Sequence, residues 1–483
     1  MEAKEDIPTI FVIFGITGDL ARRKLIPSLL DLFAKDRLPK KCAVVGFSRR
    51  ELSDENFLKI LRDSIEYAGR GYKKDVVKKF LDIVSYHQGF FDNQESYQSL
   101  EGYLLKIDRK FGQCSNKLLY LAVPPSQYEV IFQHLGGSKL GLSCDDNTGW
   151  TRILVEKPFG KDLQTAKKLD KMLGKIFQER QIFRIDHYLA KEMMQNILVF
   201  RFSNPIFQPI WNRKFIEAVR IKFYEKSSVE GRAAFYEGLG ALRDVGQNHI
   251  LQMLALVAME KPNLSDGNSI RARRAAVLSK LQPISKKDMP LRVLRAQYAG
   301  FSDLPGIPKD SQTETYFKIE ARLSNHRWRD VPFFLESGKA LSESLVEISV
   351  HFKPALFGGK KEDDFCNVLT FEIQPKSSIK IAFWAKKPGF AEDVEMRELS
   401  FSYRSDFSAP DVNVRERAVL DELPDAYEKV LYDCVRGDQT LFTSTRETSA
   451  SWKFITSILE NWQTRPLMRY KQGSKPELIR RQP

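Results

Sequence analysis

The run that most constrains the fold of this chain lies near the N-terminus and reads Phe11-Val12-Ile13-Phe14-Gly15-Ile16-Thr17-Gly18-Asp19-Leu20-Ala21. Four apolar residues end at Gly15, Gly18 follows three positions later, and apolar residues then recur at helical spacing. The pattern predicts a strand, a tight turn and a helix, a unit whose glycines let backbone N–H groups approach a pyrophosphate at the helix N-terminus. The same pattern also fits an ordinary strand-to-helix turn that binds nothing.

Apolar strands and helical segments alternate along the first third of the chain. Strands are expected at residues 11–14, 42–45, 83–88, 118–123, 152–155 and 182–185, with helices over 25–34 and 57–67. Such alternation predicts a parallel, doubly wound α/β sheet of the Rossmann type. We therefore assign residues 1–185 to a dinucleotide-binding domain.

The pattern changes after residue 185. Helices are expected over 187–199 and 245–259, and longer alternating strands over 219–224, 346–352, 368–374 and 379–384. Residues 261–288 read as a helix followed by a connecting loop. The later strands predict an α+β domain, residues 186–483, with a large, mainly antiparallel sheet that has one covered face.

The formal net charge of +14 favours anionic partners, which include nucleic acid, a membrane surface and phosphorylated small molecules. The cations are dispersed, however, and no apolar run approaches the roughly 18 residues of a membrane span. The acidic N-terminus has no apolar core typical of a signal peptide, so a cytoplasmic protein is expected. Five cysteines without CxxC spacing predict reduced thiols and no metal site.

Arg49 comes directly after the second expected strand, which ends Gly46-Phe47-Ser48 without an acidic residue. In a dinucleotide fold, an acid at this place binds the ribose hydroxyl of NAD, whereas a cation accommodates the 2′-phosphate of NADP. Arg49, with Lys24 as a helper, therefore favours NADP. A solvated arginine is the alternative.

The fifth expected strand ends at Glu156-Lys157-Pro158-Phe159-Gly160. Because the carboxyl ends of strands line the ligand crevice of an open α/β sheet, Lys157 is predicted to point at a ligand. The proline fixes the turn, and the Lys157–Pro158 bond is a candidate for the cis form. A surface lysine before a turn is the other reading.

The sixth expected strand ends at Arg184-Ile185-Asp186-His187-Tyr188-Leu189-Ala190-Lys191-Glu192. His187 and Lys191 are four residues apart, so a helix here would place them on one face, next to Tyr188, as a phosphate-binding cluster. Asp186 is expected either to cap that helix or to orient a histidine elsewhere. His249, alone, reads as a core histidine; it would become a general base if Asp186 reached its other ring nitrogen.

These motifs together resemble the glucose-6-phosphate dehydrogenase family, from about residue 10 to about residue 471. The runs 15–25, 156–160, 184–192, 204–207, 244–249 and 331–339 carry the resemblance. It implies a base, His249, with Asp186 as its partner, and a sugar-phosphate cradle of His187, Tyr188 and Lys191. It also implies sugar-hydroxyl contacts from Glu225 and Asp244, substrate-side lysines Lys157 and Lys339, and NADP contacts from Gly15, Thr17, Gly18, Asp19, Leu20, Lys24, Arg49 and Lys157.

The resemblance further implies oxidation of the C1 hydroxyl of glucose 6-phosphate to a lactone, and assembly as a homodimer or a dimer of dimers. The chain departs from the family pattern at Ala190, where Gly is usual, and at Glu336 and Glu372, where Arg is usual in members with a second, structural NADP. The two acids place that second site in doubt.

Three alternatives remain open on the sequence. Another Rossmann-type sugar oxidoreductase would share Gly15 and Lys157 but would not be expected to carry both 184–189 and 247–249. A nucleic-acid-binding protein predicts clustered cations and steep salt dependence. A catalytically silent relative is disfavoured by the intact Asp186, Lys191 and His249.

Overall fold

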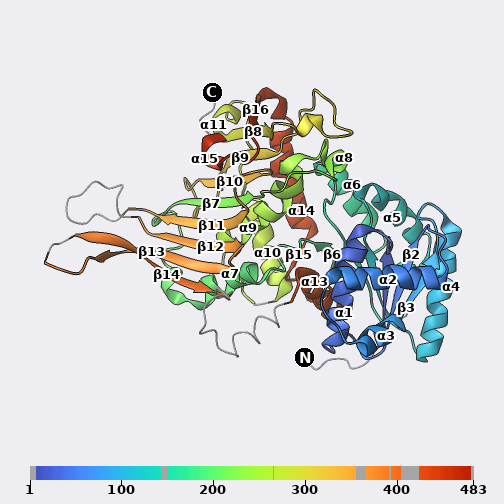
Figure 1. The fold of residues 1–483 in the computed structure, drawn as a ribbon. Coiled ribbons are helices and arrows are strands. Elements are labelled where there is room, and N and C mark those ends of the chain that lie inside the picture. Colours follow the sequence, from blue (N-terminus) through green and yellow to red (C-terminus); the bar gives the residue numbers. More distant parts are fainter. Residues whose placement is uncertain are drawn as a thin grey trace.

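The structure is a computed structural model that describes residues 7–142, 149–264, 266–354, 366–390, 393–403 and 424–479. Two sheets lie side by side, the first formed by the N-terminal part of the chain and the second by the C-terminal part (Figure 1). The first has seven strands in the order β15-β6-β5-β4-β1-β2-β3. The second has nine, in the order β14-β13-β12-β11-β7-β10-β9-β8-β16.

The first sheet is parallel except for its edge strand β15, which pairs with β6 in the antiparallel direction. Its strands are β1 (Thr9–Phe14), β2 (Cys42–Ser48), β3 (Val84–Gln88), β4 (Asn116–Leu121), β5 (Thr151–Val155), β6 (Ile182–Ile185) and β15 (Phe442–Thr443). Six of them match the strands predicted from the sequence. The seventh, β15, arrives from near the C-terminus and ties that region to the first sheet.

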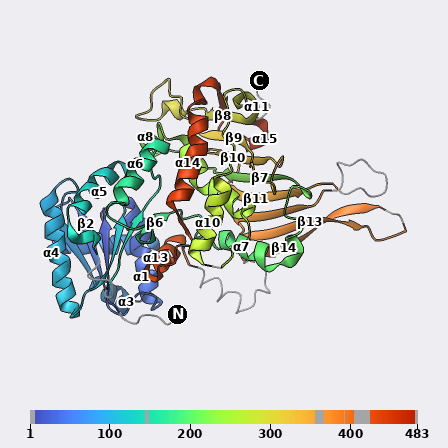
Figure 2. The same ribbon diagram turned by 180° about the vertical axis from the view of Figure 1, so that it is seen from behind.

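Helices cover both faces of the first sheet (Figure 2) because its strands alternate between two cores. Phe11 and Ile13 of β1 pack in one hydrophobic core, and Val12 and Phe14 pack in the other. The helices are η1, a π-helix (Ala21–Leu25), α1 (Ile26–Ala34), α2 (Asp54–Ala68), α3 (Lys74–Leu81), α4 (Gln94–Phe111), α5 (Tyr128–Gly136) and α6 (Leu163–Leu173).

The second sheet is mainly antiparallel, as predicted, with parallel pairs only at β7–β10 and β8–β16. Its strands are β7 (Ile216–Tyr224), β8 (Val293–Tyr298), β9 (Tyr316–Ala321), β10 (Phe333–Gly338), β11 (Leu345–Phe352), β12 (Val368–Gln374), β13 (Ser378–Lys386), β14 (Val394–Ser402) and β16 (Leu467–Tyr470). The core that holds Phe11 continues into this sheet through Ile221 and Phe371.

Helices of the second part lie over the second sheet and at its junction with the first (Figures 1 and 2). They are α7 (Glu192–Ser203), α8 (Ala233–Tyr236), the π-helix η6 (Leu242–Ile250), α9 (Leu251–Ala258), α10 (Gly267–Leu278), α11 (Met289–Arg292), α13 (Ala426–Arg436), α14 (Thr445–Leu459) and α15 (Pro476–Ile479). Single 3₁₀ turns lie at Pro125–Gln127, Lys139–Gly141, Glu179–Gln181, Pro205–Phe207, Phe301–Asp303 and Trp462–Thr464. The boundary between the two domains at residues 185/186 stays a prediction. It does not account for β15, which follows that boundary in the sequence but belongs to the first sheet.

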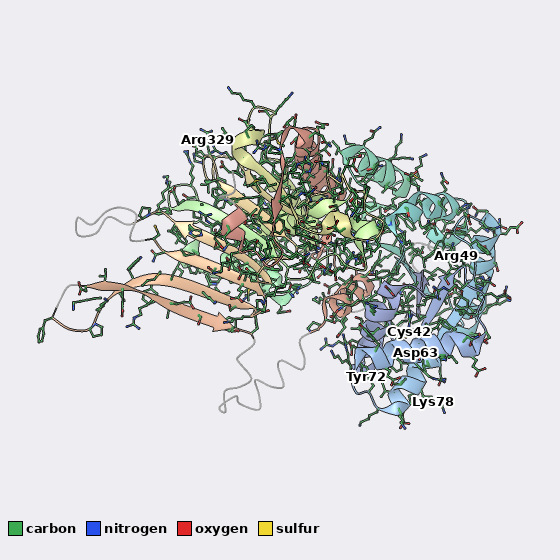
Figure 3. The ribbon with its side chains drawn as sticks, turned by 45° about the horizontal axis from the view of Figure 1, so that its top comes forward. Cys42, Arg49, Asp63, Tyr72, Lys78 and Arg329 are labelled. Carbon is green, nitrogen blue, oxygen red and sulfur yellow. The ribbon has the colours of Figure 1, made fainter. Side chains whose placement is uncertain are left out.

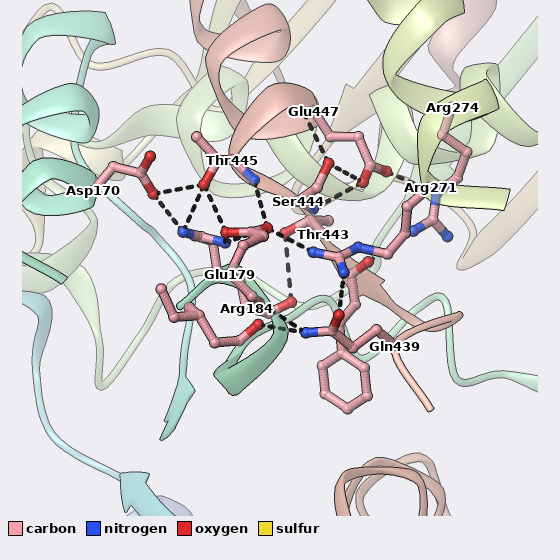
Figure 4. Close-up of polar contacts among 12 residues, drawn as sticks. Asp170, Glu179, Arg184, Arg271, Arg274, Gln439, Thr443, Ser444, Thr445 and Glu447 are labelled. Atoms are coloured by element: carbon pink, nitrogen blue, oxygen red, sulfur yellow. Dashed lines mark hydrogen bonds and ion pairs between the residues drawn. The ribbon is translucent and has the colours of Figure 1, made fainter. Parts of the chain in front are cut away.

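Charged side chains at the junction, of which Arg184, Arg271, Arg274 and Glu447 are buried, join β6 and α6 to α10 and α14 (Figure 4). Arg184 donates to Glu179 at 3.1 Å and to Asp170, and Arg271 donates to Glu179 at 2.7 Å. Arg274 donates through Nε to Glu447 at 2.7 Å. We call this set the junction cluster; it comprises Asp170, Glu179, Arg184, Arg271, Arg274, Gln439, Thr445 and Glu447.

The cysteine prediction is wrong at one position. Cys114 is disulfide-bonded, whereas Cys42, Cys366 and Cys434 form no disulfide and Cys144 lies outside the described residues. Dispersed sequence spacing led to the prediction of reduced thiols, but pairing depends on the distance between Cα atoms in the fold. Sequence spacing does not report that distance.

Candidate active site

One cleft lies where the carboxyl ends of strands from both sheets meet. The turn after β1 and the residues after β5 and β6 form its first wall, and the residues after β7 and β10 form its second. Gly18 lines it through its backbone, and the polar and aromatic side chains of the lining are those of Asp19, Arg23, Lys24, Glu156, Lys157, His187, Tyr188, Phe223, Glu225, Arg232, Phe235, Asp244, His249, Lys339 and Tyr427.

The glycine turn has the geometry that the sequence predicted. Gly15 has a φ of +80°, and a Cβ there would lie 2.6 Å from the carbonyl oxygen of Ala122. Gly18 donates its N–H to Gly15 at 2.9 Å and then leads into η1. Thr17 is buried with its hydroxyl 3.4 Å from that of Ser48. A side chain at Gly15 would collide with Ala122, the residue after β4, so this tight turn requires glycine, and the turn leads into a helix as a dinucleotide site does.

The two cations predicted for a 2′-phosphate lie in different surroundings. Arg49 is exposed just beyond β2 and lies outside the lining of the cleft (Figure 3). Lys24 lines the cleft, with its Nζ 3.7 Å from Asp425, the residue that caps α13. The role of each toward a 2′-phosphate stays a prediction.

The structure brings Asp186 and His249 together. His249 lies on η6, and its Nδ1 is 2.5 Å from Oδ1 of Asp186 at the end of β6. The same oxygen accepts the N–H of Tyr188 at 3.0 Å, so Asp186 also caps the turn that follows the strand. Because Nδ1 is engaged, Nε2 is the ring nitrogen that remains for a ligand. The condition set from the sequence, that Asp186 reach a ring nitrogen of His249, is met, and the role of His249 as a base stays a prediction.

Burial and charge set the protonation of this dyad. Burial lowers the pKa of His249, the Asp186 carboxylate raises it, and the net pKa lies below the ordinary value. For Asp186, burial raises the pKa, but the neighbouring imidazole outweighs it and the net pKa is lowered. Burial, with the charges of His249 and Lys157, also holds the pKa of His187 well below its usual range. At neutral pH the dyad is therefore a carboxylate with a neutral imidazole, ready to accept a proton.

The helix expected over 187–199 begins only at Glu192, so His187 and Lys191 do not share a helix face. Residues 187–190 form turns, in which Leu189 donates to the Asp186 carbonyl at 3.0 Å and Lys191 donates to that of Tyr188 at 3.0 Å. The Asp186 side chain favours this turn over a helix because it binds the N–H of Tyr188. Folding still gathers the predicted residues: Lys191 Nζ lies 4.3 Å from the Tyr188 ring centroid, and the His187 and His249 centroids are 4.9 Å apart.

A second charged group, which we call the cleft cluster, comprises Lys157, Glu225, Asp244 and Lys339. Lys157 follows β5 across a cis bond to Pro158 and donates to Oδ1 of Asp244 at 3.0 Å. Lys339 pairs with Glu225 and lies 3.8 Å from Oδ2 of Asp244. Burial raises the pKa of Asp244, but the two ammonium groups outweigh it and hold that pKa well below its usual range. Hydrogen-bonding groups of both signs are thus fixed in the cleft.

Some residues that line or support the cleft were missed by sequence analysis. Tyr427 on α13 stacks on His187, with 6.0 Å between ring centroids, and Tyr188 donates to Gln374 at 2.9 Å. Both partners lie far along the chain from the residues they contact, and neither has a local motif that marks it. Glu156 accepts from Tyr120 at 2.6 Å, and burial raises its pKa to about 7. The position of Glu156 next to Lys157 was the one sequence feature that could have indicated its place in the cleft.

Comparison with known proteins agrees with this geometry along the whole chain. The NAD-binding domain of glucose-6-phosphate dehydrogenase matches residues 12–196, and its C-terminal domain matches residues 198–479. The chain belongs to the glucose-6-phosphate dehydrogenase family. It is 38% identical over 477 residues to glucose-6-phosphate 1-dehydrogenase of Borreliella burgdorferi, with 96% of this chain and 94% of the relative covered. It is 39% identical over 459 residues to the Aggregatibacter actinomycetemcomitans protein of that name, with 93% and 90% covered.

A solved structure titled glucose-6-phosphate dehydrogenase in complex with its substrate glucose-6-phosphate superimposes with a TM-score of 0.89 at 32% identity, covering 99% of this chain and 98% of that one. Membership of the glucose-6-phosphate dehydrogenase family makes this chain an oxidoreductase of CH–OH groups with NADP as coenzyme. It also decides against the other Rossmann-type sugar oxidoreductases. Within the described residues, no helix is long and apolar enough to cross a membrane.

The two acids that depart from the family pattern are held by their own chain. Glu336 on β10 accepts from the Tyr316 hydroxyl at 2.5 Å. Glu372 on β12 accepts from the N–H of Lys376 at 3.2 Å and pairs with Lys380 at 3.0 Å. Neither supplies a cation for a second coenzyme, so that site remains unassigned. Ala190 is buried in the turn before Lys191.

Proposed function

We propose that this chain oxidises the C1 hydroxyl of glucose 6-phosphate to 6-phosphoglucono-1,5-lactone, the first step of the oxidative pentose phosphate pathway. The observation that carries the proposal is the Asp186–His249 dyad, buried at the back of a cleft between a dinucleotide-type turn and a second set of charged side chains. NADP bound at that turn supplies the hydride acceptor. The remaining chemistry belongs to this chain.

His249 Nε2 is the base that takes the proton of the C1 hydroxyl. An alkoxide at C1 and a carbocation at C1 are both unfavourable, so removal of the proton has to accompany loss of the hydride. Asp186 stabilises the imidazolium that forms and keeps Nε2 aimed at the substrate, because it already holds Nδ1. Proton and hydride both leave the sugar, and the lactone carbonyl forms.

The rest of the cleft orients the sugar. His187, Tyr188 and Lys191 bind the 6-phosphate, which fixes one end of the substrate. The cleft cluster binds the hydroxyls: Glu225 and Asp244 accept hydrogen bonds, and Lys157 and Lys339 donate them. Gly15, Thr17, Gly18, Asp19, Leu20, Lys24, Arg49 and Lys157 hold the coenzyme.

The direct test is absorbance at 340 nm with purified protein, glucose 6-phosphate, and NADP or NAD in parallel. NADP is expected to support faster turnover at equal concentration, because β2 is followed directly by Arg49 and not by an acid that would bind a free ribose hydroxyl. Free glucose serves as the control for the phosphate contacts. Absence of reduction with both coenzymes would reject the proposed activity.

We infer further that the chain forms a homodimer, or a dimer of dimers, through its second sheet. Met396, Leu399 and Phe401 on β14 are more than half exposed, which is costly for a strand that faces water alone. Light scattering on the purified protein tests this inference, since a monomer at micromolar concentration would contradict it. One relative, from Arabidopsis thaliana, is named cytoplasmic, and we propose the same location here.

A further inference from the structure

A small cavity lies beside the catalytic dyad, behind the cleft. It shares Glu156 and Lys157 with the cleft, and its deeper wall comes from the end of β6, from the start of α9 and from α14. Arg184, Asp186, Gln252, Thr448 and Ser451 line that deeper part. The volume is about 30 Å³, whereas one water molecule needs roughly 10–15 Å³. The cavity is therefore polar and large enough for water.

Three buried polar atoms in this lining have no hydrogen-bond partner among the described residues. They are Oδ2 of Asp186, Oε1 of Gln252 and Nε of Arg184, and each of the three residues is 2% exposed. Buried polar atoms are almost always paired with protein or with ordered water. Two acceptors and one donor without partners thus belong to side chains that line one small cavity.

Hydrogen bonds outside the cavity determine which atoms of Asp186 and Arg184 lack a partner. Oδ1 of Asp186 is used twice, by His249 and by the N–H of Tyr188. The two Nη atoms of Arg184 are held in the junction cluster by Asp170, Glu179 and Thr445, as Figure 4 shows. Oδ2 of the aspartate and Nε of the arginine are the atoms that these contacts leave.

A water molecule has two O–H donors and can accept a hydrogen bond from a third group, which matches two acceptors and one donor. We propose that the cavity is a hydration site in which one ordered water donates to Asp186 Oδ2 and Gln252 Oε1 and accepts from Arg184 Nε. Gln252 is then a positioning residue for the dyad: it acts on Asp186 through the water and touches neither substrate nor coenzyme. The functional part of this statement rests on the proposed dehydrogenase activity.

The water has a definite effect on the dyad. A hydrogen bond donated to a carboxylate favours its charged form and fixes its plane, so Asp186 stays ionised and aimed at His249. The dyad titrates as a coupled pair, and removing a donor from its anion raises the pH at which the pair takes up a proton. Besides His249 and Arg184, the titratable or charged groups that face Asp186 are Glu156, Lys157, His187 and Tyr188, and they are the same in every variant below.

The first experiment is a high-resolution crystal structure of the whole wild-type chain. Electron density for an ordered water within hydrogen-bonding distance of both Asp186 Oδ2 and Gln252 Oε1 is expected. A cavity without density, or a protein group bonded to Asp186 Oδ2, would overturn the proposal. This readout does not depend on turnover, so it separates failure of the hydration site from failure of the proposed function.

The second experiment compares Gln252→Met with Gln297→Met. Gln297 is a matched control, since it is fully buried on β8 and its Oε1 also lacks a partner among the described residues. Gln252→Met should raise the acid-side pKa of kcat/KM by roughly half to one unit, with KM for glucose 6-phosphate changed less than about twofold. Gln297→Met should leave the pH profile in place. Equal profiles for the two variants would reject a positioning role for Gln252.

Discussion

The junction cluster and the cleft cluster both pair cations with carboxylates, but the cations are arginines in the first and lysines in the second. In the junction cluster, the Arg274 guanidinium binds Glu447, the carbonyl of Thr440 at 2.8 Å and that of Phe442 at 2.7 Å, and its side chain is 1% exposed. In the cleft cluster, Lys157 and Lys339 have side chains that are 23% and 13% exposed and face a cleft. Arg274 is bonded through all three guanidinium nitrogens within the protein, whereas the ammonium groups of the cleft cluster are open to a ligand.

The difference indicates how buried charge is divided between folding and chemistry. A planar guanidinium whose N–H groups donate to carboxylates and backbone carbonyls stabilises the β6–β15 contact and has few N–H groups available for a ligand. An ammonium that pairs with a carboxylate at the edge of a cleft can exchange part of that contact for a sugar hydroxyl. We therefore expect changes in the junction cluster to affect stability and changes around the cleft to affect turnover.

The largest effect is expected for His249→Asn. Asparagine keeps an N–H that can donate to Asp186, so folding is little affected, but it cannot accept the C1 proton near neutral pH. A positioned general base contributes about 10²–10⁴-fold, so kcat should fall by that factor. Steady-state kinetics, with coenzyme affinity measured by fluorescence titration, provide the check.

The partner variant sharpens this prediction. Asp186→Asn should cost less than His249→Asn, because the base remains but its imidazolium is less stabilised. The double variant should be much less than additive, since the two groups act as one unit. Fully additive losses would show that the base lies elsewhere.

The next effect is on stability and concerns Arg274→Met in the junction cluster. It leaves the Glu447 carboxylate, 0% exposed, without its guanidinium. Breaking a buried pair from one side typically costs 3–5 kcal/mol, so the free energy of unfolding should fall by about that amount while kcat of the folded fraction changes little. Urea unfolding followed by fluorescence measures the loss.

A matched control separates burial from charge in this comparison. Lys309→Met removes the same kind of ion pair at the surface, between Lys309 and Asp303, where both side chains are mostly exposed. No measurable change in unfolding is expected there. If Arg274→Met instead lowered kcat and left stability intact, the distinction between the two clusters would be lost.

The residues of the cleft differ in how far the sequence could predict them. Gly15, Lys157 and Asp186 each follow a strand of the first sheet within a local motif, and parallel strands place such residues at one edge, so the crevice was predictable. The start of α7 was not, because the Asp186 side chain competes locally with the helix. Tyr427 was not either, because it reaches the cleft on a helix that returns from far along the chain.

A further prediction concerns the phosphate end of the cleft. Lys191→Ala should weaken glucose 6-phosphate use by roughly 1.5–3 kcal/mol in kcat/KM, about 10- to 150-fold, because a charge-assisted contact is removed. Free glucose, which lacks the phosphate, should be affected far less. Steady-state kinetics with both sugars decide the matter: an equal loss on each would mean that Lys191 acts on the sugar ring or on folding.

The smallest effect is expected for Arg49→Ala, and it tests the coenzyme side. Arg49 is exposed, so solvent and salt screen its charge and the contact with a 2′-phosphate should lie near the lower end of the 1.5–3 kcal/mol range, about tenfold in selectivity for NADP over NAD. NAD carries no 2′-phosphate, so its kcat/KM should stay constant, and the NADP effect should shrink as salt is raised. Arg50→Ala, one residue further on and also exposed, is the matched control. Equal losses with both coenzymes would show that Arg49 does not bind the 2′-phosphate. Lys24, the one of the two predicted cations that lines the cleft, would then be the candidate.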